Sequence, residues 1–267
     1  MSTSQVPMAK ALDHPAAGPA ITHEKIYLYA IVLGAEARTY EWRGIDAQRV
    51  YAIVHGGLAA IVSPLQGGKV RPDRTRLAAH HELLKKLMTD TTPLPMAFGM
   101  VAKSHTAVRK LLARNQRTLI EGLRHVAGKV EMGLRVRWDV PNIFEYFVNV
   151  HPELRQARDR LVGVNSHPTQ EHKIEVGSMF DHLLQEDRDS YIDQTTEALS
   201  ERGFEVKPLK CRSELEVMTL ACLVKREEMA GFESAVFEIA KQFDDNFALD
   251  YNGPWTPHNF VPLDLSL

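Results

Sequence analysis

Residues 129–140 read KVEMGLRVRWDV, and apolar side chains occupy every second position of this segment. The two alternating sets are Val130, Met132, Leu134, Val136, Trp138 and Val140 on one side, and Lys129, Glu131, Gly133, Arg135, Arg137 and Asp139 on the other. A period of two residues is typical of a β-strand with one face in a core and the other in water. The segment therefore predicts a long strand with one buried face and one wet face.

The residues that follow predict a complete domain around this strand. The predicted elements are, in order, a short helix after Pro141, a polar link at 163–168, a long helix over 169–202 bent near Gly177, strands at 204–209 and 215–224, a helix with its apolar face from Met229 to Phe243, and a strand ending at Asn252. The order is β-α-β-β-α-β, which is the ferredoxin-like order. It predicts two helices covering one face of a four-stranded antiparallel sheet over residues 129–252.

The first half of the chain predicts a second domain of the same class over residues 25–103. The predicted elements are a strand at 26–33, a hairpin of 49–54 and 58–62 around Gly56 and Gly57, a helix capped by Asp73 with Leu77, His81, Leu84 and Met88 buried, and a strand at 96–101. The segment between Leu33 and Arg49 is expected to take the place of a reduced first helix.

A single amphipathic helix over residues 104–128 is expected to join the two domains, with Ser104 as its cap and Gly128 as its stop. Residues 1–24 predict a flexible leader, because they are rich in Ala, Pro, Ser and Thr. Residues 253–267 predict a tail packed on the body. The expected fold class is therefore α+β, with two ferredoxin-like domains in tandem joined by a helix.

The amino-acid composition makes some classes of binding partner unfavourable. The 267 residues include 32 Lys and Arg against 34 Asp and Glu, which gives a formal net charge of −2. This balance provides no bulk attraction to nucleic acid or to anionic lipid. No stretch reaches the ~20 apolar residues of a membrane span, and residues 1–24 lack the apolar run of a signal peptide. We expect a cytoplasmic protein that binds neither nucleic acid nor membranes.

The residues that most resemble a catalytic or metal site have simpler explanations. His80 and His81 are adjacent on a predicted helix and point about 100° apart, whereas paired metal ligands on a helix lie four residues apart. Asp244 and Asp245 follow an apolar helix and are expected to be a solvated helix end. The sequence contains no nucleophile elbow and no phosphate-binding loop. We expect no catalysis, no metal and no cofactor.

Three segments carry a resemblance to a known family: YLYAIV at 27–32, PLPMAFGMV at 93–101 and YNGPWTPHNFV at 251–261. The matching positions are Pro95, Phe98 and Gly99 in a P-x-x-F-G segment, and Tyr251, Gly253, Pro254, Trp255, Pro257 and Phe260 in a Y-x-G-P-W-P-P-Y-x-F segment, where Thr256 replaces a proline and His258 a tyrosine. On these residues the chain resembles the gas vesicle accessory proteins of the GvpF/GvpL family, in order from about Lys25 to Val261.

The resemblance implies a non-enzymatic minor component or assembly factor of gas vesicles. Such a protein is expected to bind the small hydrophobic shell protein and other gas vesicle accessory proteins, in the cytoplasm and at the vesicle. Two roles stay open for Trp255 and Phe260, a structural clamp between the domains or direct contact with a partner. A function of another class also stays open, a small-molecule sensor with its ligand held between two ferredoxin-like domains.

Overall fold

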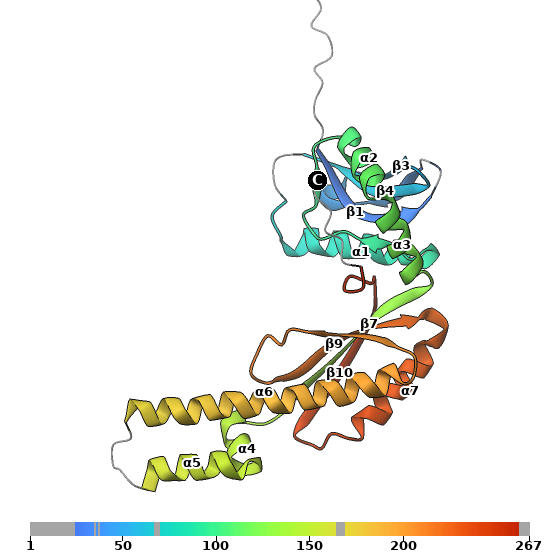
Figure 1. Cartoon of the computed structure of the whole chain (residues 1–267). Helices are drawn as coiled ribbons and strands as arrows, with labels where there is room; N and C mark the ends of the chain where they lie inside the picture. The colour runs from blue at the N-terminus through green and yellow to red at the C-terminus, as the bar shows by residue number, and fades with distance from the viewer. Residues whose placement is uncertain (1–24, 35, 37, 67–69, 164–168, 262–267) are drawn as a thin grey trace, which may run out of the picture.

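The structure is a computed structural model that describes residues 25–34, 36, 38–66, 70–163 and 169–261. The chain forms two separate antiparallel sheets, one from each half, with helices packed on both (Figure 1). The predicted leader at 1–24, residues 164–168 of the predicted link and residues 262–267 of the predicted tail lie outside the described residues. Among the described residues, no helix combines the length and apolar character needed to cross a bilayer.

The first sheet has six strands in the order β2-β3-β4-β1-β5, and β6 also pairs with β1. The bounds in this half are β1 Lys25–Leu33, β2 Thr39–Arg43, β3 Arg49–His55, β4 Leu58–Leu65, α1 Arg74–Asp90, β5 Leu94–Pro95, β6 Val101–Ala102, α2 His105–Arg114 and α3 Gln116–Val126. Residues from Ile26 to Ile31 of β1 are fully buried, because α1 covers one face of the sheet and α2 with α3 covers the other. A central strand covered on both sides is what its apolar sequence predicts.

Two predictions for the first half differ from the structure. The segment between Leu33 and Arg49 holds strand β2 and a short 3-10 turn rather than a reduced helix, since Tyr40 and Trp42 alternate with polar residues and share one face. In α1 the buried histidine is His80, not His81, and Leu77 is half-buried. Leu84 and Met88 are buried as predicted, and the buried face of α1 is widened by Leu83 and Leu87.

Two predicted continuous elements are interrupted. The predicted strand at 96–101 is a loop between the two-residue strands β5 and β6, which both pair with β1. The predicted connecting helix is two helices, α2 and α3, which meet at Asn115. The Asn115 side chain donates a hydrogen bond to the Leu111 carbonyl oxygen at 2.9 Å and so competes with the helical backbone there. Both helices pack on the first sheet.

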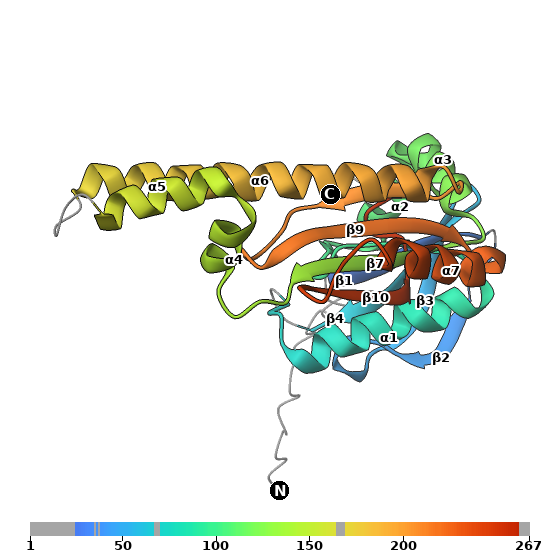
Figure 2. The same ribbon diagram turned by 90° about the horizontal axis from the view of Figure 1, so that it is seen from below.

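The second sheet has four antiparallel strands in the order β10-β7-β9-β8. The bounds are β7 Lys129–Trp138, α4 Ile143–Val150, α5 Pro152–Gly163, α6 Gln170–Ser200, β8 Glu205–Leu209, β9 Glu216–Lys225, α7 Met229–Ala240 and β10 Phe247–Trp255. Helices α6 and α7 lie on the face of the sheet that carries Val130, Leu134 and Trp138, as the alternation in β7 predicts (Figure 2).

Helix α6 is one helix of 31 residues, about 46 Å at 1.5 Å per residue, without the predicted bend near Gly177. Its first turns extend beyond the sheet, where α5 lies beside them (Figure 2). Helix α5 is absent from the predicted elements, because its polar sequence PELRQARDR has a weak apolar period. Burial of Leu154 anchors it.

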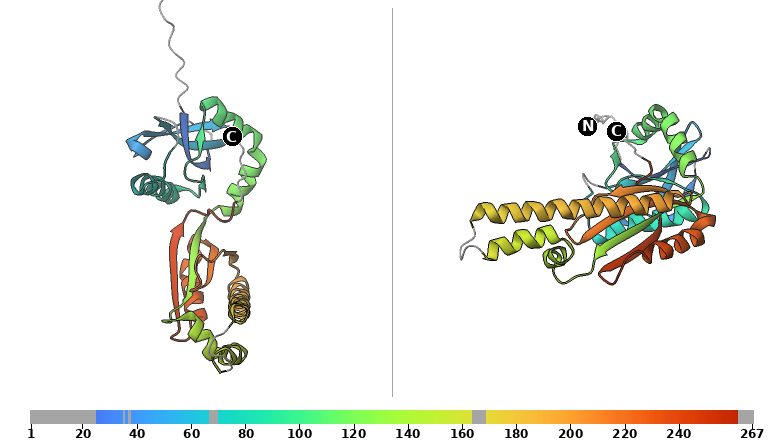
Figure 3. Two further views of the ribbon diagram at one scale, coloured as in Figure 1. Left: turned by 90° about the vertical axis from the view of Figure 1, so that its left-hand side faces the viewer. Right: turned by 60° about the horizontal axis from the view of Figure 1, so that its bottom comes forward.

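The chain returns to the first half after β10, and this return joins the two sheets (Figure 3). Strand β10 runs past the predicted end at Asn252, since Trp255 pairs again with Glu131 of β7 after an irregular step. The prediction that Glu131 lies on a solvent-exposed face of β7 is wrong, because this residue is only 7% exposed. Its carboxylate accepts hydrogen bonds from the Asn259 backbone nitrogen at 2.8 Å and from Asn259 Nδ2 at 2.7 Å.

Phe260, next to this contact, is 2% exposed and belongs to a core shared by both halves. The cluster around it includes Leu94 and Met96 from the first half and Ala221 and Leu223 from β9. The ammonium of Lys207 lies 5.1 Å from the centre of the Phe260 ring. Phe260 therefore packs between the two sheets.

Truncation of Phe260 is expected to cost far more stability than truncation of Trp255. Phe260→Ala leaves a cavity in a shared core and is predicted to lower the free energy of unfolding by about 3–5 kcal/mol. Trp255 is 40% exposed, so Trp255→Ala is predicted to cost about 1 kcal/mol. Urea unfolding of the two variants measures the difference, and equal losses would contradict this assignment.

Candidate partner-binding surfaces

Pro95 is buried on β5 opposite Ala30 of β1, and Phe98 and Gly99 lie against a buried aromatic cluster in the first half. The Phe98 ring lies edge-on to the rings of Tyr27 and His80, with centroids 6.1 Å and 5.7 Å away. Gly99 has a φ of 89°, which favours glycine, and its backbone nitrogen donates to the Tyr27 hydroxyl at 3.1 Å. This segment of the motif therefore closes the sheet over its own core.

His80 is the titratable group at the centre of that cluster. Its Nδ1 lies 3.0 Å from the Tyr27 hydroxyl oxygen, and the whole residue is 1% exposed. Burial lowers the pKa of His80 to about 4, and the nearby His81 and His258 add to the effect. The imidazole is accordingly neutral at pH 7 and acts as a packed, hydrogen-bonded core group.

The C-terminal motif residues divide into a buried and an exposed set. Pro257 and Phe260 are buried, whereas Tyr251, Gly253, Pro254 and Trp255 are exposed. Gly253 has a φ of 131°, and a Cβ atom there would lie 2.7 Å from Met132 Sδ, so no larger residue fits without movement of β7. The first set packs between the sheets, and the second lies along the strand next to solvent.

Three aromatic residues in the described part of the second half are exposed: Tyr251 and Trp255 lie on β10, and Phe237 lies on α7. The exposed fractions are 39% for Tyr251, 40% for Trp255 and 57% for Phe237. Phe237 and Tyr251 form an edge-on ring contact, and the Tyr251 hydroxyl donates to Glu233. Trp255 lies on the other face of the strand, opposite Glu131, where the Lys85 ammonium of α1 is 5.9 Å from the centre of its ring. The sequence did not indicate Phe237 as a surface residue of interest, because the apolar face predicted for α7 is formed by other residues of that helix.

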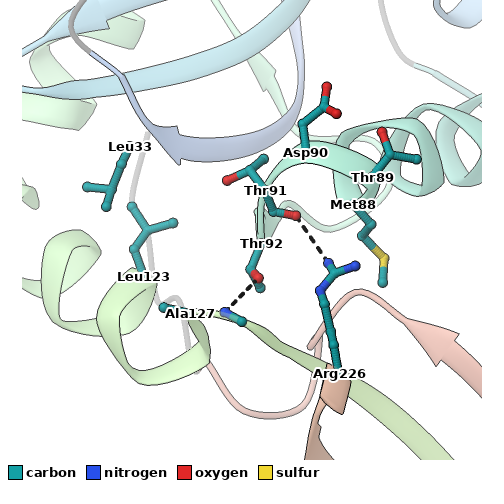
Figure 4. Close-up of a pocket in the computed structure, with 10 residues that line it drawn as sticks. Leu33, Met88, Thr89, Asp90, Thr91, Thr92, Leu123, Ala127 and Arg226 are labelled. Atoms are coloured by element: carbon teal, nitrogen blue, oxygen red, sulfur yellow. Dashed lines mark hydrogen bonds between the residues drawn. The ribbon is translucent and has the colours of Figure 1, made fainter. Parts of the chain in front are cut away.

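A hollow of about 380 Å³ lies where the two halves meet (Figure 4). Leu33 and Leu123 lie on one side of it, and Met88 and Arg226 on the other. Arg226 Nη2 donates to the Thr91 carbonyl oxygen at 3.2 Å, and the Gly128 nitrogen donates to Thr92 Oγ1 at 3.1 Å. These two hydrogen bonds join the end of α1 to the second sheet and form the floor of the hollow.

A second hollow of about 500 Å³ continues from the first, because both are lined by Leu33, Asp90 and Thr91. Its wall includes the stacked rings of Tyr40 and Trp42, with centroids 4.8 Å apart. We name the two hollows together the apolar groove. Leu33 stands between them with 56% of its surface exposed. Sequence reasoning missed the groove because its walls come from β1, β2, α1 and α3.

The chemistry of these surfaces fits the binding of apolar groups. The groove is lined by aliphatic and aromatic side chains together with three threonines and four charged residues, which are Thr89, Thr91, Thr92, Glu36, Arg38, Asp90 and Arg226. Across the described ranges, no group of three or more His, Cys, Asp or Glu residues is placed to hold a metal ion. A surface of this kind offers apolar contact with a partner.

The buried His80 predicts a specific loss of stability in acid. In the unfolded chain a histidine has a pKa near 6.5, above the folded value of about 4, so the unfolded state takes up the proton first as the pH falls. Stability is therefore lost between about pH 6.5 and pH 4. From pH 7.5 to pH 4.5 the wild type should lose about 2 kcal/mol more than His80→Gln in urea unfolding. The exposed His55→Gln is the control and should behave as the wild type; equal losses in all three would disprove the assignment.

Comparisons with known proteins agree over nearly the whole chain. The sequence model described as gas vesicle synthesis protein GvpL/GvpF matches residues 25–262. Gas vesicle protein F of Nostoc sp. (strain PCC 7120) is 27% identical over 241 residues, covering 89% of this chain and 98% of that protein. Gas vesicle protein F of a Streptomyces species is 29% identical over 220 residues, covering 82% and 90%.

Solved structures show the same fold. The crystal structure of gas vesicle protein GvpF from Anabaena sp. PCC7120 superimposes with a TM-score of 0.76 at 25% identity, covering 90% of this chain and 99% of that one. The structure of GvpF from Microcystis aeruginosa gives a TM-score of 0.74. The similarity to these structures does not favour the alternative function, a small-molecule sensor with its ligand held between the two domains. The match over residues 25–262, together with the shared fold, shows that the chain belongs to the GvpL/GvpF family of gas vesicle synthesis proteins.

Proposed function

We propose that this protein is a non-enzymatic assembly factor or minor structural component of gas vesicles. It binds the small hydrophobic shell protein and other gas vesicle accessory proteins during vesicle formation, in the cytoplasm and at the vesicle. No cofactor takes part in this role. The family assignment and the apolar character of the exposed surfaces support the proposal.

The observation that carries the proposal is the apolar groove. Leu33 is more than half exposed although it ends a strand whose residues 26–32 are all buried. Leaving a large aliphatic side chain in water beside the rings of Tyr40 and Trp42 gains nothing for the fold alone. An apolar segment of a shell subunit placed in the groove removes this surface from water.

The architecture suits a holding role. We propose two ferredoxin-like domains over residues 25–103 and 129–252, with residues 104–128 connecting them and residues 253–261 packed on the body. In this arrangement Pro95, Phe98, Gly99, Pro257 and Phe260 stabilise the body, whereas Tyr251 and Trp255 remain available for a partner. Gly253 and Pro254 shape the strand that presents these two aromatics.

Replacement of Leu33 tests the groove. Leu33→Asp puts a charge into the apolar contact and should reduce capture of co-expressed shell protein about tenfold, which corresponds to about 1.4 kcal/mol. Capture is measured by affinity purification of the tagged chain from cells that express the whole set of gas vesicle proteins, followed by quantification of the shell protein.

The matched control is Ile174→Asp on α6, since Ile174 is 58% exposed and lies outside the groove. It should capture shell protein as the wild type does, and both variants should unfold at similar urea concentrations. Absence of shell protein from the wild-type purification would reject the proposed function. Undiminished capture by Leu33→Asp would reject the groove as its site.

A further inference from the structure

We propose that two copies of this chain bind each other through oppositely charged helix surfaces. The solvent-facing side of α2 and α3 in each copy lies against the solvent-facing side of α6 in the other copy. This inference goes beyond the proposed function, and it holds whether or not the apolar groove binds shell protein. It rests on the charges of the two surfaces and on their placement in the fold.

The first surface is a basic one on α2 and α3. Val108, Leu112 and Leu119 hold these two helices on the first sheet, so the other sides of the helices face solvent. The exposed cations on those sides, which we name the basic face, are Arg109, Lys110, Arg114, Arg117 and Arg124. Against them the two helices carry one carboxylate, Glu121, which pairs with Arg117 at 2.8 Å. Within the part of the chain that the structure describes, no ion pair or hydrogen bond engages the other four cationic side chains.

The second surface is an acidic one on α6. The exposed carboxylates that share one side of this helix, which we name the acidic stripe, are Glu171, Glu175, Glu186, Asp189, Asp193 and Glu197. At about 100° per residue they fall within about 80° of arc, on the side away from Phe180 and Leu184, which pack in the core. His182 is the basic side chain on this arc of the described helix, and its Nε2 lies 3.3 Å from Glu186 Oε1. Like charges gathered along one helix face repel one another, and a cationic surface brought against them relieves this repulsion.

Helix α1 shows how charges are arranged on a solvated helix surface of the same molecule. Its cations and anions are interspersed and pair locally, since Lys85 lies 3.5 Å from Glu82, and Arg76 lies 2.9 Å from Asp46 of the short 3-10 turn. Such pairs neutralise each other where they stand. The basic face and the acidic stripe each gather one sign of charge, and they lie on elements from different halves of the chain.

The placement of the two surfaces allows two contacts to form at once. Helices α2 and α3 lie on one side of the first sheet, and α6 lies on the same side of the second sheet, as Figure 2 and the left view of Figure 3 show. The basic face and the acidic stripe therefore point in the same direction from the two halves of the molecule. A second copy related by a two-fold axis across the junction of the halves places its acidic stripe on the basic face of the first copy, and the reverse. The same contact then forms twice in one closed dimer.

The charges select both this partner and this orientation. If like halves faced each other, the basic faces of the two copies would meet and the acidic stripes would meet, which like-charge repulsion disfavours. The whole chain has a formal net charge of −2, so no strong bulk repulsion keeps two copies apart. A second copy supplies both complementary surfaces in equal number, which a uniformly acidic or uniformly basic partner does not.

Sedimentation equilibrium of the full chain tests the inference. The wild type should form a dimer at low salt, and about 0.5 M NaCl should weaken the dimer about tenfold, because salt screens exposed charges. Two charge-reversed variants are compared with the wild type, one altered on the basic face and one on the acidic stripe. The combined substitutions are Arg109→Glu, Lys110→Glu and Arg114→Glu in the first variant, and Glu186→Lys, Asp189→Lys and Asp193→Lys in the second. Each variant alone should be monomeric, because the attraction between the two surfaces is lost.

A mixture of the two variants gives the sharpest readout. In the mixed pair, the reversed basic face of one variant meets the reversed acidic stripe of the other, and the two unchanged surfaces also meet. A heterodimer should therefore form about tenfold more tightly than either variant associates with itself. Recovery in the mixture also shows that both variants are folded.

The control variant combines Arg43→Glu, Arg49→Glu and Arg74→Glu, which reverse three exposed cations of the first half outside the basic face. It should dimerise as the wild type does. A wild type that stays monomeric at low salt, equal loss in the control, or no recovery in the mixture would overturn the inference. A monomeric wild type that binds a polyglutamate peptide through the basic face would also overturn it, by assigning that face to an acidic segment of another protein.

Discussion

The buried contact between Glu131 and Asn259 fixes how the two halves of the molecule sit together. Burial raises the pKa of the Glu131 carboxyl, while the two hydrogen bonds from Asn259 and the charge of Lys207 act in the opposite direction. A buried carboxylate is costly unless its oxygens have partners, so the segment after β10 is held in one place along β7. Phe260 then enters the core shared by both sheets, and the chain cannot leave that core without breaking both hydrogen bonds to Glu131 and exposing the Phe260 ring.

The apolar groove depends on this arrangement. The apolar groove has walls from the first sheet and from the junction with the second, so its shape requires the end of α1 to stay against Arg226 and Gly128. A groove held in one shape is suited to holding another protein in a fixed geometry, because little ordering is required on binding.

The sequence predicts the fold well where one local period dominates. The alternation of β7, the apolar run of β1 and the caps at Asp73 and Ser104 all correspond to observed elements. It fails where distant residues decide the outcome. By its place in the alternation of β7, Glu131 should be exposed to solvent. It is buried because Asn259, 128 residues later in the chain, binds its carboxylate. The candidate surfaces were only partly predictable. The C-terminal motif contains Tyr251 and Trp255, but it does not contain Phe237 or the residues that line the groove. Those residues come together only in the folded chain.

The most direct test of the central claim is amide hydrogen exchange of the whole chain with and without purified shell protein. Exchange should slow on binding at the end of β1 around Leu33, in β2 and at the C-terminal end of α1, since these segments line the groove. The N-terminal part of α6, which projects away from the groove, should exchange at the same rate in both states. Protection confined to α5 and α6, or none anywhere, would contradict the claim that the apolar groove holds the shell protein.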